Sequence, residues 1–268
     1  MLVTGKDIVI RVNDINICLD DVGTGNTPLL FIHGFPFDKS MWQPQQDFFS
    51  KQRRVITYDI RGFGQSTSSD AEAGMSLYAD DLVGIMDVLQ LPKVIACGLS
   101  MGGYILLDAV SRYPERFEAI VLSDTQCIAD SPEGKEKRFK TIEQIQAEGK
   151  NNFAEGFVKN IFCAETQEKK NEVVQGIKNV ILNTSADTII AALKALAGRN
   201  ERCTDLSGID IPALILCGKE DKITPPVQSE FLHANIAGSK LKIIEGAGHM
   251  TNLEQSEEFN TVVAQFIH

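Results

Sequence analysis

The chain has 268 residues, 43% of them hydrophobic, which is enough for one large core. Its 36 acidic and 26 basic residues give a formal net charge of -10, which repels phosphate backbones and anionic lipid surfaces. Nucleic acid and membrane partners are therefore not expected. The first residues lack the charged start and apolar run of a signal peptide, and no apolar stretch is long enough to cross a bilayer, so we expect a cytoplasmic protein.

Six cysteines are scattered along the chain, with neither C-x-x-C spacing nor a His at metal-ligand spacing. We expect all of them to be reduced, mostly buried thiols. Cys97 and Cys217 lie in apolar runs typical of interior strands, where a free cysteine behaves as a small hydrophobe.

The order of apolar runs along the chain predicts the fold class. Two segments, 7–14 and 15–23, alternate polar and apolar residues and predict an antiparallel hairpin. Short runs that are apolar throughout follow, as is typical of parallel strands covered on both faces. They span 28–34, 54–60, 93–99, 119–124, 212–218 and 239–246. Helical spacing at 75–90, 101–114 and 253–267 separates several of them. This alternation predicts an α/β fold with a mostly parallel, doubly wound sheet of about eight strands.

One long interval interrupts this alternation. Between the strands at 119–124 and 212–218, the chain is rich in helix formers and has no convincing strand. We interpret 127–203 as a helical cap and 1–126 with 204–268 as the core. Open α/β sheets carry their sites at the carboxyl ends of the strands, so the cap is expected there.

A candidate nucleophile lies in the sequence Gly-Leu-Ser-Met-Gly at 98–102, which matches G-x-S-x-G. The match alone is weak, but it follows an apolar strand and opens a helix, which is the setting that this motif needs. Such a turn holds the serine in a strained conformation, and the flanking glycines provide the space to close it. The alternative is a glycine-rich helix start that binds an anion. We identify Ser100 as the candidate nucleophile.

A serine hydroxyl needs an adjacent base, and the base needs a carboxylate that orients it. Of the four histidines, His249 lies on a Gly-flanked loop between the last strand and the last helix. Asp221 follows the strand at 212–218 and gives the chain order Ser, Asp, His that such a nucleophile turn requires. Glu220 and Asp124 are the alternative acids. Taken alone, a loop His is often a solvated residue, and an Asp before a helix is often its cap.

The attacked carbonyl oxygen gains charge and needs two N–H donors, each worth on the order of 3 kcal/mol in barrier height. We expect these donors to be the backbone N–H groups of Met101 and Phe35. Phe35 belongs to the sequence His-Gly-Phe-Pro after the third strand, which also fits a plain tight turn. The two interpretations are compatible.

These segments together resemble the α/β-hydrolase superfamily over nearly the whole chain. The matching residues are HGF at 33–35, DIRGFGQS at 59–66, GLSMGG at 98–103, the Asp in KEDKITPP and the His in GAGHM. The resemblance implies the α/β-hydrolase fold, and it implies that Asp59, Arg61 and Ser66 shape a turn and do not react.

GLSMGG is most similar to 3-oxoadipate enol-lactonases and small-ester carboxylesterases. C–C bond hydrolases of the meta-cleavage type and cofactor-free perhydrolases are also similar. Haloalkane dehalogenases and epoxide hydrolases use an Asp nucleophile, whereas position 100 is Ser.

The predicted function is that of a serine hydrolase cleaving a small-molecule ester or lactone. Ser100 forms an acyl-enzyme, His249 transfers the protons, and Asp221 orients His249. No metal or organic cofactor is needed. We expect four apolar residues to contact the substrate: Trp42, Phe139, Phe153 and Phe157. If the substrate is a carboxylated lactone, a cap Arg should face the pocket, and the candidates are Arg138, Arg199 and Arg202.

Three other functions fit the same residues. A C–C bond hydrolase or a perhydrolase uses the same catalytic groups on another substrate. A ligand receptor could keep the fold and the triad while using the pocket only for binding.

Overall fold

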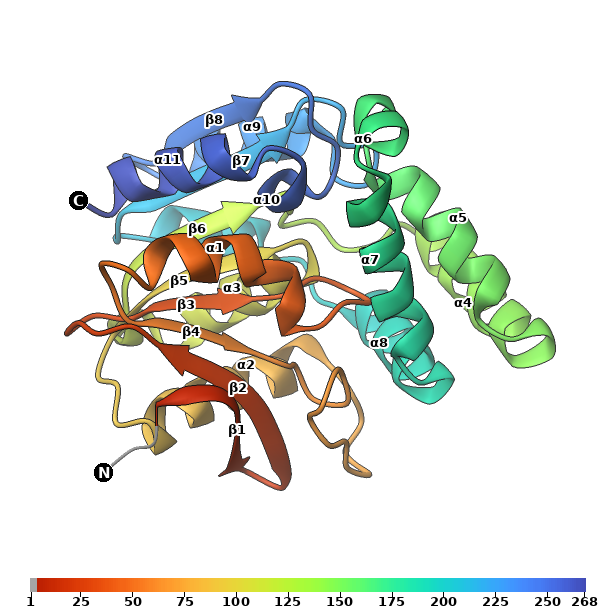
Figure 1. Ribbon diagram of the computed structural model, residues 1–268, viewed down its shortest axis with the longest axis horizontal. Helices are drawn as coiled ribbons and strands as arrows, with labels where there is room; N and C mark the ends of the chain where they lie inside the picture. The colour runs from red at the N-terminus through yellow and green to blue at the C-terminus, as the bar shows by residue number, and fades with distance from the viewer. Residues whose placement is uncertain (1–3) are drawn as a thin grey trace.

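The computed structural model describes residues 4–268 and contains one sheet of eight strands (Figure 1). The strands are β1 Gly5–Val12, β2 Ile15–Val22, β3 Leu29–Ile32, β4 Val55–Tyr58, β5 Val94–Leu99, β6 Phe117–Ser123, β7 Ala213–Gly218 and β8 Lys240–Ile244. They lie in the order β1-β2-β4-β3-β5-β6-β7-β8. Strand β2 is antiparallel to both of its neighbours, and every other pairing is parallel. The predicted α/β fold, with its opening hairpin, is confirmed.

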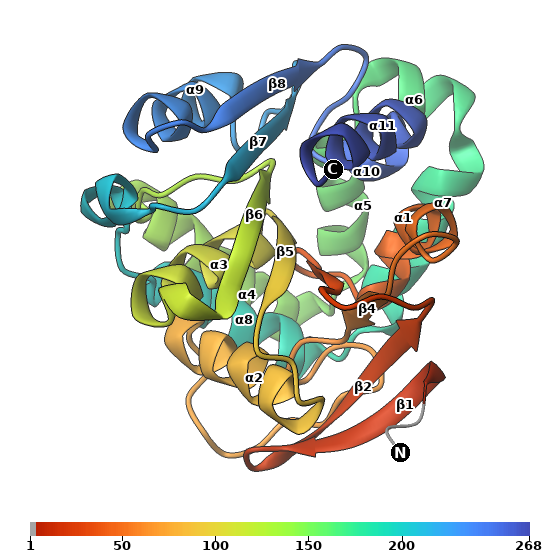
Figure 2. The ribbon, with the colours of Figure 1, turned by 90° about the vertical axis from the view of Figure 1, so that its left-hand side faces the viewer.

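Helices cover both faces of the sheet. Strands such as β3, β4, β5 and β7 are therefore buried at every residue. Helices α1 (Gln43–Phe49) and α11 (Ser256–Phe266) cover one face, and α2 (Met75–Val88), α3 (Met101–Arg112) and α9 (Pro226–Asn235) cover the other (Figure 2). The short helix α10 (Thr251–Glu254) precedes α11. Three 3₁₀ turns lie at Lys39–Trp42, Pro114–Arg116 and Cys203–Gly208.

Five helices lie in the interval between β6 and β7, and they are grouped together beyond one end of the strands (Figure 1). They are α4 Pro132–Glu148, α5 Asn151–Ile161, α6 Ala164–Lys169, α7 Asn171–Asn183 and α8 Ala186–Gly198. Local sequence sets their ends: the hydroxyl of Ser131 caps α4, that of Ser185 caps α8, and α4 stops at Gly149, whose φ is 79°. The division of the chain at 127 and 203 stays a prediction.

Within residues 4–268, no single helix has the length and apolar composition to cross a membrane, although α7 and α8, bent by 96°, meet the test as a pair.

A disulfide corrects the expectation that all six cysteines are reduced. Cys127 and Cys203 are bonded, with Cα atoms 4.9 Å apart, and the N–H of Arg202 donates to the carbonyl of Cys127. Their separation of 76 residues hid this pairing, because it depends on where the chain leaves and re-enters the core. The other four cysteines are free and buried, as expected.

Reduction of this disulfide should destabilise the protein, because opening a long closed loop raises the conformational entropy of the unfolded chain. The chain-entropy model gives about 4 kcal/mol for a loop of this length, which corresponds to roughly 7 °C in Tm. We expect dithiothreitol to lower the Tm of the wild type and to leave that of Cys203→Ser unchanged. Six alkylated thiols in unreduced, denatured protein would contradict the pairing.

Candidate active site

Ser100 occupies a sharp turn between β5 and α3, as the G-x-S-x-G motif predicts. Its φ of 54° is unusual for a residue with a side chain, and such strain is typical of a nucleophile turn. A Cβ at Gly98 would lie 2.4 Å from the Gly102 carbonyl oxygen, and one at Gly102 would lie 2.2 Å from the Ile32 carbonyl oxygen. Only glycine lets these backbone segments approach so closely.

His249 and Asp221 form a buried hydrogen-bonded pair. The Nδ1 of His249 lies 2.8 Å from Oδ2 of Asp221, and both residues are almost fully buried. Asp221 also accepts hydrogen bonds from the Thr224 hydroxyl and from the backbone N–H groups of Ile223 and Thr224. These contacts fix the carboxylate, so it can fix the ring.

The pKa directions of this pair follow from their contact. Burial alone would raise the pKa of Asp221, but the charge and hydrogen bond of His249, with those of Thr224, hold it below its usual value. Burial alone would lower the pKa of His249, but Asp221, with smaller effects from Asp124 and Glu254, raises it. The environment therefore stabilises a positively charged imidazole.

The alternative acids lie elsewhere. Glu220 is exposed. Asp124 is fully buried at the end of β6 and bonds to neither ring nitrogen of His249. Its Oδ1 accepts from the Gly218 N–H at 2.9 Å, and its Oδ2 accepts from the hydroxyls of Ser123 and Thr251. The geometry thus pairs Asp221, and not Asp124, with the imidazole.

The loop after β3 lies against the nucleophile turn. A Cβ at Gly34 would lie 3.3 Å from the Cβ of Ser100. Among the described residues, neither the Phe35 nor the Met101 backbone N–H donates a hydrogen bond within the chain. Two free donors beside a serine can receive a developing oxyanion.

His33 holds this loop in place. Its Nε2 accepts from the Ile60 N–H and its Nδ1 lies 2.8 Å from the Gly34 carbonyl oxygen, which fits a neutral ring protonated at Nδ1. Burial lowers the pKa of His33 to about 4. The ring is therefore a neutral structural group.

The DIRGFGQS segment is structural, as the resemblance implies. Asp59 accepts from the backbone N–H groups of Lys39 and Gln65, and the Ser66 hydroxyl donates to the Asp59 carbonyl. Arg61 is buried in a two-bond ion pair with Asp81.

Within residues 4–268, no hydrogen bond joins the Ser100 hydroxyl to His249, whose ring contacts are with Asp221 and Thr224. Hydrogen bonds of this kind often tighten only when substrate is bound.

A cavity of about 650 Å³ lies near this site; α4 and α5 line most of it, and neither Ser100 nor His249 is among its lining residues. Phe35 on the loop after β3, Phe153 and Phe157 on α5, and Ile223 beside Asp221 all line it. The ring of Phe35 lies 6.1 Å from that of Phe153 and 5.9 Å from that of Phe157, so aromatic packing joins the loop to α5. This cavity is suited to an organic substrate with an apolar part.

Two expected contacts are corrected. Trp42 is 0% exposed and packs in the core against Phe31, with ring centroids 4.7 Å apart, so it does not reach the cavity. Phe139 is 49% exposed to solvent and is not among the residues that line the cavity.

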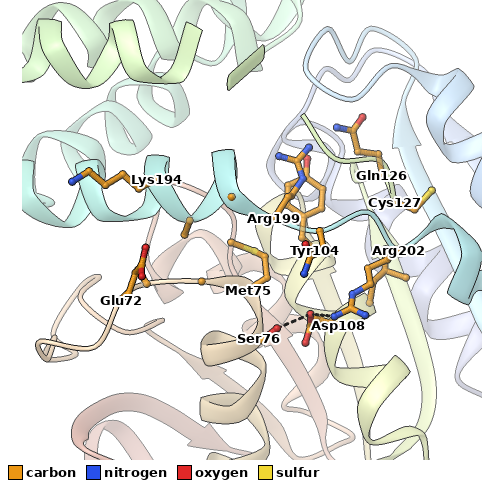
Figure 3. A pocket seen from close by; sticks show the side chains of 16 residues that line it. Glu72, Met75, Ser76, Tyr104, Asp108, Gln126, Cys127, Lys194, Arg199 and Arg202 are labelled. Carbon is orange, nitrogen blue, oxygen red and sulfur yellow. Dashed lines mark hydrogen bonds and ion pairs between the residues drawn. The ribbon is translucent and has the colours of Figure 1, made fainter. Parts of the chain in front are cut away.

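The three arginines in the predicted cap, 127–203, separate into two groups. Arg138 lines the large cavity and bonds to Asp130. Arg199 and Arg202 line a smaller cavity of about 220 Å³, where α8 meets α2 and α3 (Figure 3). There Arg199 is buried, bonding to Asp130, and Arg202 pairs with Asp108. Arg138 is thus the arginine that faces the candidate substrate site.

One group of side chains among the described residues has metal-ligand character, namely Asp124, Cys217 and Asp221. Its carboxylates already bond to His249 and to nearby hydroxyls and N–H groups. That the chain works without a metal or organic cofactor stays a prediction.

The family model for the alpha/beta hydrolase fold matches residues 27–256. The chain belongs to this family. It is 28% identical to 3-oxoadipate enol-lactonase 2 of Acinetobacter baylyi, over 88% of this chain and 86% of that protein. It is 30% identical to the AB hydrolase superfamily protein YisY of Bacillus subtilis, over 94% and 95%.

Solved structures of other α/β hydrolases are also similar. A thermophilic esterase from Thermogutta terrifontis, with malate bound, is 34% identical, with a TM-score of 0.92 and 97% of each chain covered. The enol-lactonase of Burkholderia xenovorans is 27% identical, with a TM-score of 0.91, covering 97% of this chain and 99% of that one. The expected similarity to enol-lactonases and esterases is confirmed.

Asp124 should make the stability of the protein depend on pH. Burial, together with the charge of Asp221, raises its pKa from 3.8 to about 7. The unfolded state therefore loses this proton first, and stability falls as pH rises from about 4 to 7. Asp124→Asn keeps an acceptor for Gly218 and cannot ionise, so its Tm should rise relative to the wild type as pH rises from about 4 to 7.

The matched control is Asp210→Asn, at an exposed position. A Tm difference between Asp124→Asn and the wild type that stays constant with pH contradicts this assignment.

Proposed function

We propose that this α/β hydrolase cleaves a carboxylic ester or lactone of a small molecule, with Ser100, His249 and Asp221 as its catalytic triad. The observation that carries the proposal is the buried hydrogen bond between His249 and Asp221, at the sheet edge where Ser100 occupies a strained turn. The enol-lactonase and esterase relatives support this substrate class.

The steps follow from the positions of the groups. His249 removes the proton of Ser100, whose oxygen attacks the carbonyl carbon and forms a bond to it. The N–H groups of Phe35 and Met101 receive the charge on the carbonyl oxygen. His249 then gives its proton to the leaving alcohol as the C–O bond breaks. A water activated by His249 releases the acid and restores Ser100.

Residues 127–203 act in this proposal as a cap that closes over the substrate. Phe153 and Phe157 supply its apolar contacts, and their rings pack against that of Phe35. C–C bond hydrolysis and perhydrolysis use the same catalytic groups, so the cap decides which substrate reaches Ser100.

The substrate carries an acidic group in this proposal. Three basic side chains line the cavity (Lys137, Arg138 and Lys222) against two acidic ones (Asp130 and Glu148), and Arg199 shares Asp130. A chain with a net charge of -10 thus places a positive excess in this cavity. Arg138 has N–H donors left over after its bonds to Asp130, and they suit a carboxylate.

The proposed compartment is the cytoplasm, because four of the six cysteines are unpaired thiols. The Cys127–Cys203 disulfide favours an oxidising compartment instead. Fractionation of the source cells should recover the protein with cytoplasmic marker proteins, and recovery in a non-cytoplasmic fraction would contradict this compartment.

Ser100→Ala should abolish hydrolysis of short p-nitrophenyl esters, with a loss of at least about 10⁴-fold in kcat, because the nucleophile is removed. A panel of esters, lactones and thioesters then ranks the natural bond type. Equal activity of the two proteins, or labelling of another residue by a serine-directed fluorophosphonate, contradicts the assignment. Slow single turnover with tight ligand binding would favour the receptor alternative.

Arg138→Gln should raise KM about tenfold for an ester that carries a distant carboxylate, because one charge-assisted hydrogen bond is lost. The matching neutral ester should be unaffected. Lys140→Gln, on the same helix but paired at the surface with Glu136, is the control. Equal changes in KM for both esters would show that Arg138 does not bind the carboxylate.

A further inference from the structure

Glu254 is a fully buried carboxylate that no step of the proposed mechanism uses. It lies at the end of α10, five residues after His249. Its Oε1 accepts from the Gly248 N–H at 2.8 Å and from the Met250 N–H at 3.2 Å. The carboxylate therefore holds the backbone on both sides of the histidine.

The other oxygen of Glu254 reaches the cap. Its Oε2 accepts from the N–H of Cys163 at 2.8 Å, at the junction of α5 and α6. The Lys170 ammonium, at the junction of α6 and α7, donates to the backbone carbonyl of Glu254. Two bonds thus join the cap to α10.

The backbone of the histidine loop also lies directly against the cap. The His249 N–H donates to the Ile161 carbonyl at 2.7 Å. A Cβ at Gly248 would lie 2.8 Å from both the Cys163 nitrogen and the Ile161 oxygen, so no side chain could stand there without separating the two segments. The cap and the loop share one hydrogen-bonded seam.

We propose that Glu254 is a positioning residue that couples the cap to His249, so that the placement of the cap sets the placement of the imidazole. The inference rests on the proposed function of His249 as the base. Phe153 and Phe157 on α5 line the cavity, and α5 ends at Ile161, so the helix that lines the cavity ends at this seam. Substrate contact with the cap is thereby connected to the geometry of the base.

The charged groups that act on His249 are Asp221 from the loop after β7, Asp124 from the end of β6 and Glu254 from α10. Each of these carboxylates raises the pKa of the imidazole. Removing the charge of Glu254 should lower that pKa and move the acid limb of kcat/KM to lower pH. Loss of this charge alone would shift the limb and leave the maximal kcat unchanged, so a fall in kcat is the effect that marks a positioning role.

The test compares Glu254→Gln with Glu257→Gln, an exposed glutamate three residues later. The glutamine keeps one acceptor oxygen for the histidine loop, but its amide nitrogen cannot accept from Cys163. We expect kcat to fall about tenfold with KM within about twofold, and the acid limb to shift to lower pH. Glu257→Gln should match the wild type. A folded Glu254→Gln enzyme with wild-type kcat overturns the proposal, whether or not its acid limb shifts.

A second pair of variants keeps the test decisive if Glu254→Gln does not fold. Lys170→Met removes the other bond at an exposed position, and Lys169→Met is its neighbour in a surface pair with Glu165. Lys170→Met should lower kcat a few-fold, whereas Lys169→Met should not; equal kcat values overturn the coupling. Activity in Ser100→Ala would instead contradict the proposed function, so the two failures are distinct.

Discussion

The hydrogen bond between Asp221 and His249 is the interaction on which the site depends. Both groups are removed from water, and such a pair is tolerated only when its geometry is good and its other polar atoms are satisfied. The turn after β7 meets this need, because Thr224 and Ile223 donate to the same carboxylate. The parallel sheet then places this turn at the same edge as Ser100.

Three buried carboxylates surround one imidazole, and they have different roles. Asp221 contacts the ring, Asp124 joins the ends of β6 and β7 to α10, and Glu254 holds the loop that carries the ring. Asp124 and Glu254 accept from backbone N–H groups or hydroxyls instead of pairing with a cation. Their bonds fix the ends of several elements, which gives the site a rigid frame.

Much of the fold could be predicted because its signals are local. Wholly apolar runs became buried strands, and the glycines around Ser100 are required by close backbone contacts. His249 and Asp221 followed from the chemistry that Ser100 needs, together with their positions after strands. The structure brings these two residues into contact, which chain order alone could not establish.

The features that sequence reasoning missed depend on long-range packing. An aromatic residue in a helix can face the core, the cavity or solvent, and Trp42, Phe153 and Phe139 represent these three outcomes. The Cys127–Cys203 bond joins residues 76 positions apart. Glu254 did carry a signal, since a glutamate in an otherwise helical segment close after the histidine can bond back to its loop, but only the fold shows that it reaches Cys163.

Trapping the acyl-enzyme tests the roles of Ser100, His249 and Asp221 most directly. Rapid quenching of the wild type with p-nitrophenyl acetate, followed by peptide mapping, should place an acetyl group on Ser100. Acylation should be slower in Asp221→Asn, with its acid limb at lower pH, because the imidazole loses its carboxylate. An acetyl group on another residue, or wild-type acylation by Asp221→Asn at every pH, would contradict the central claim.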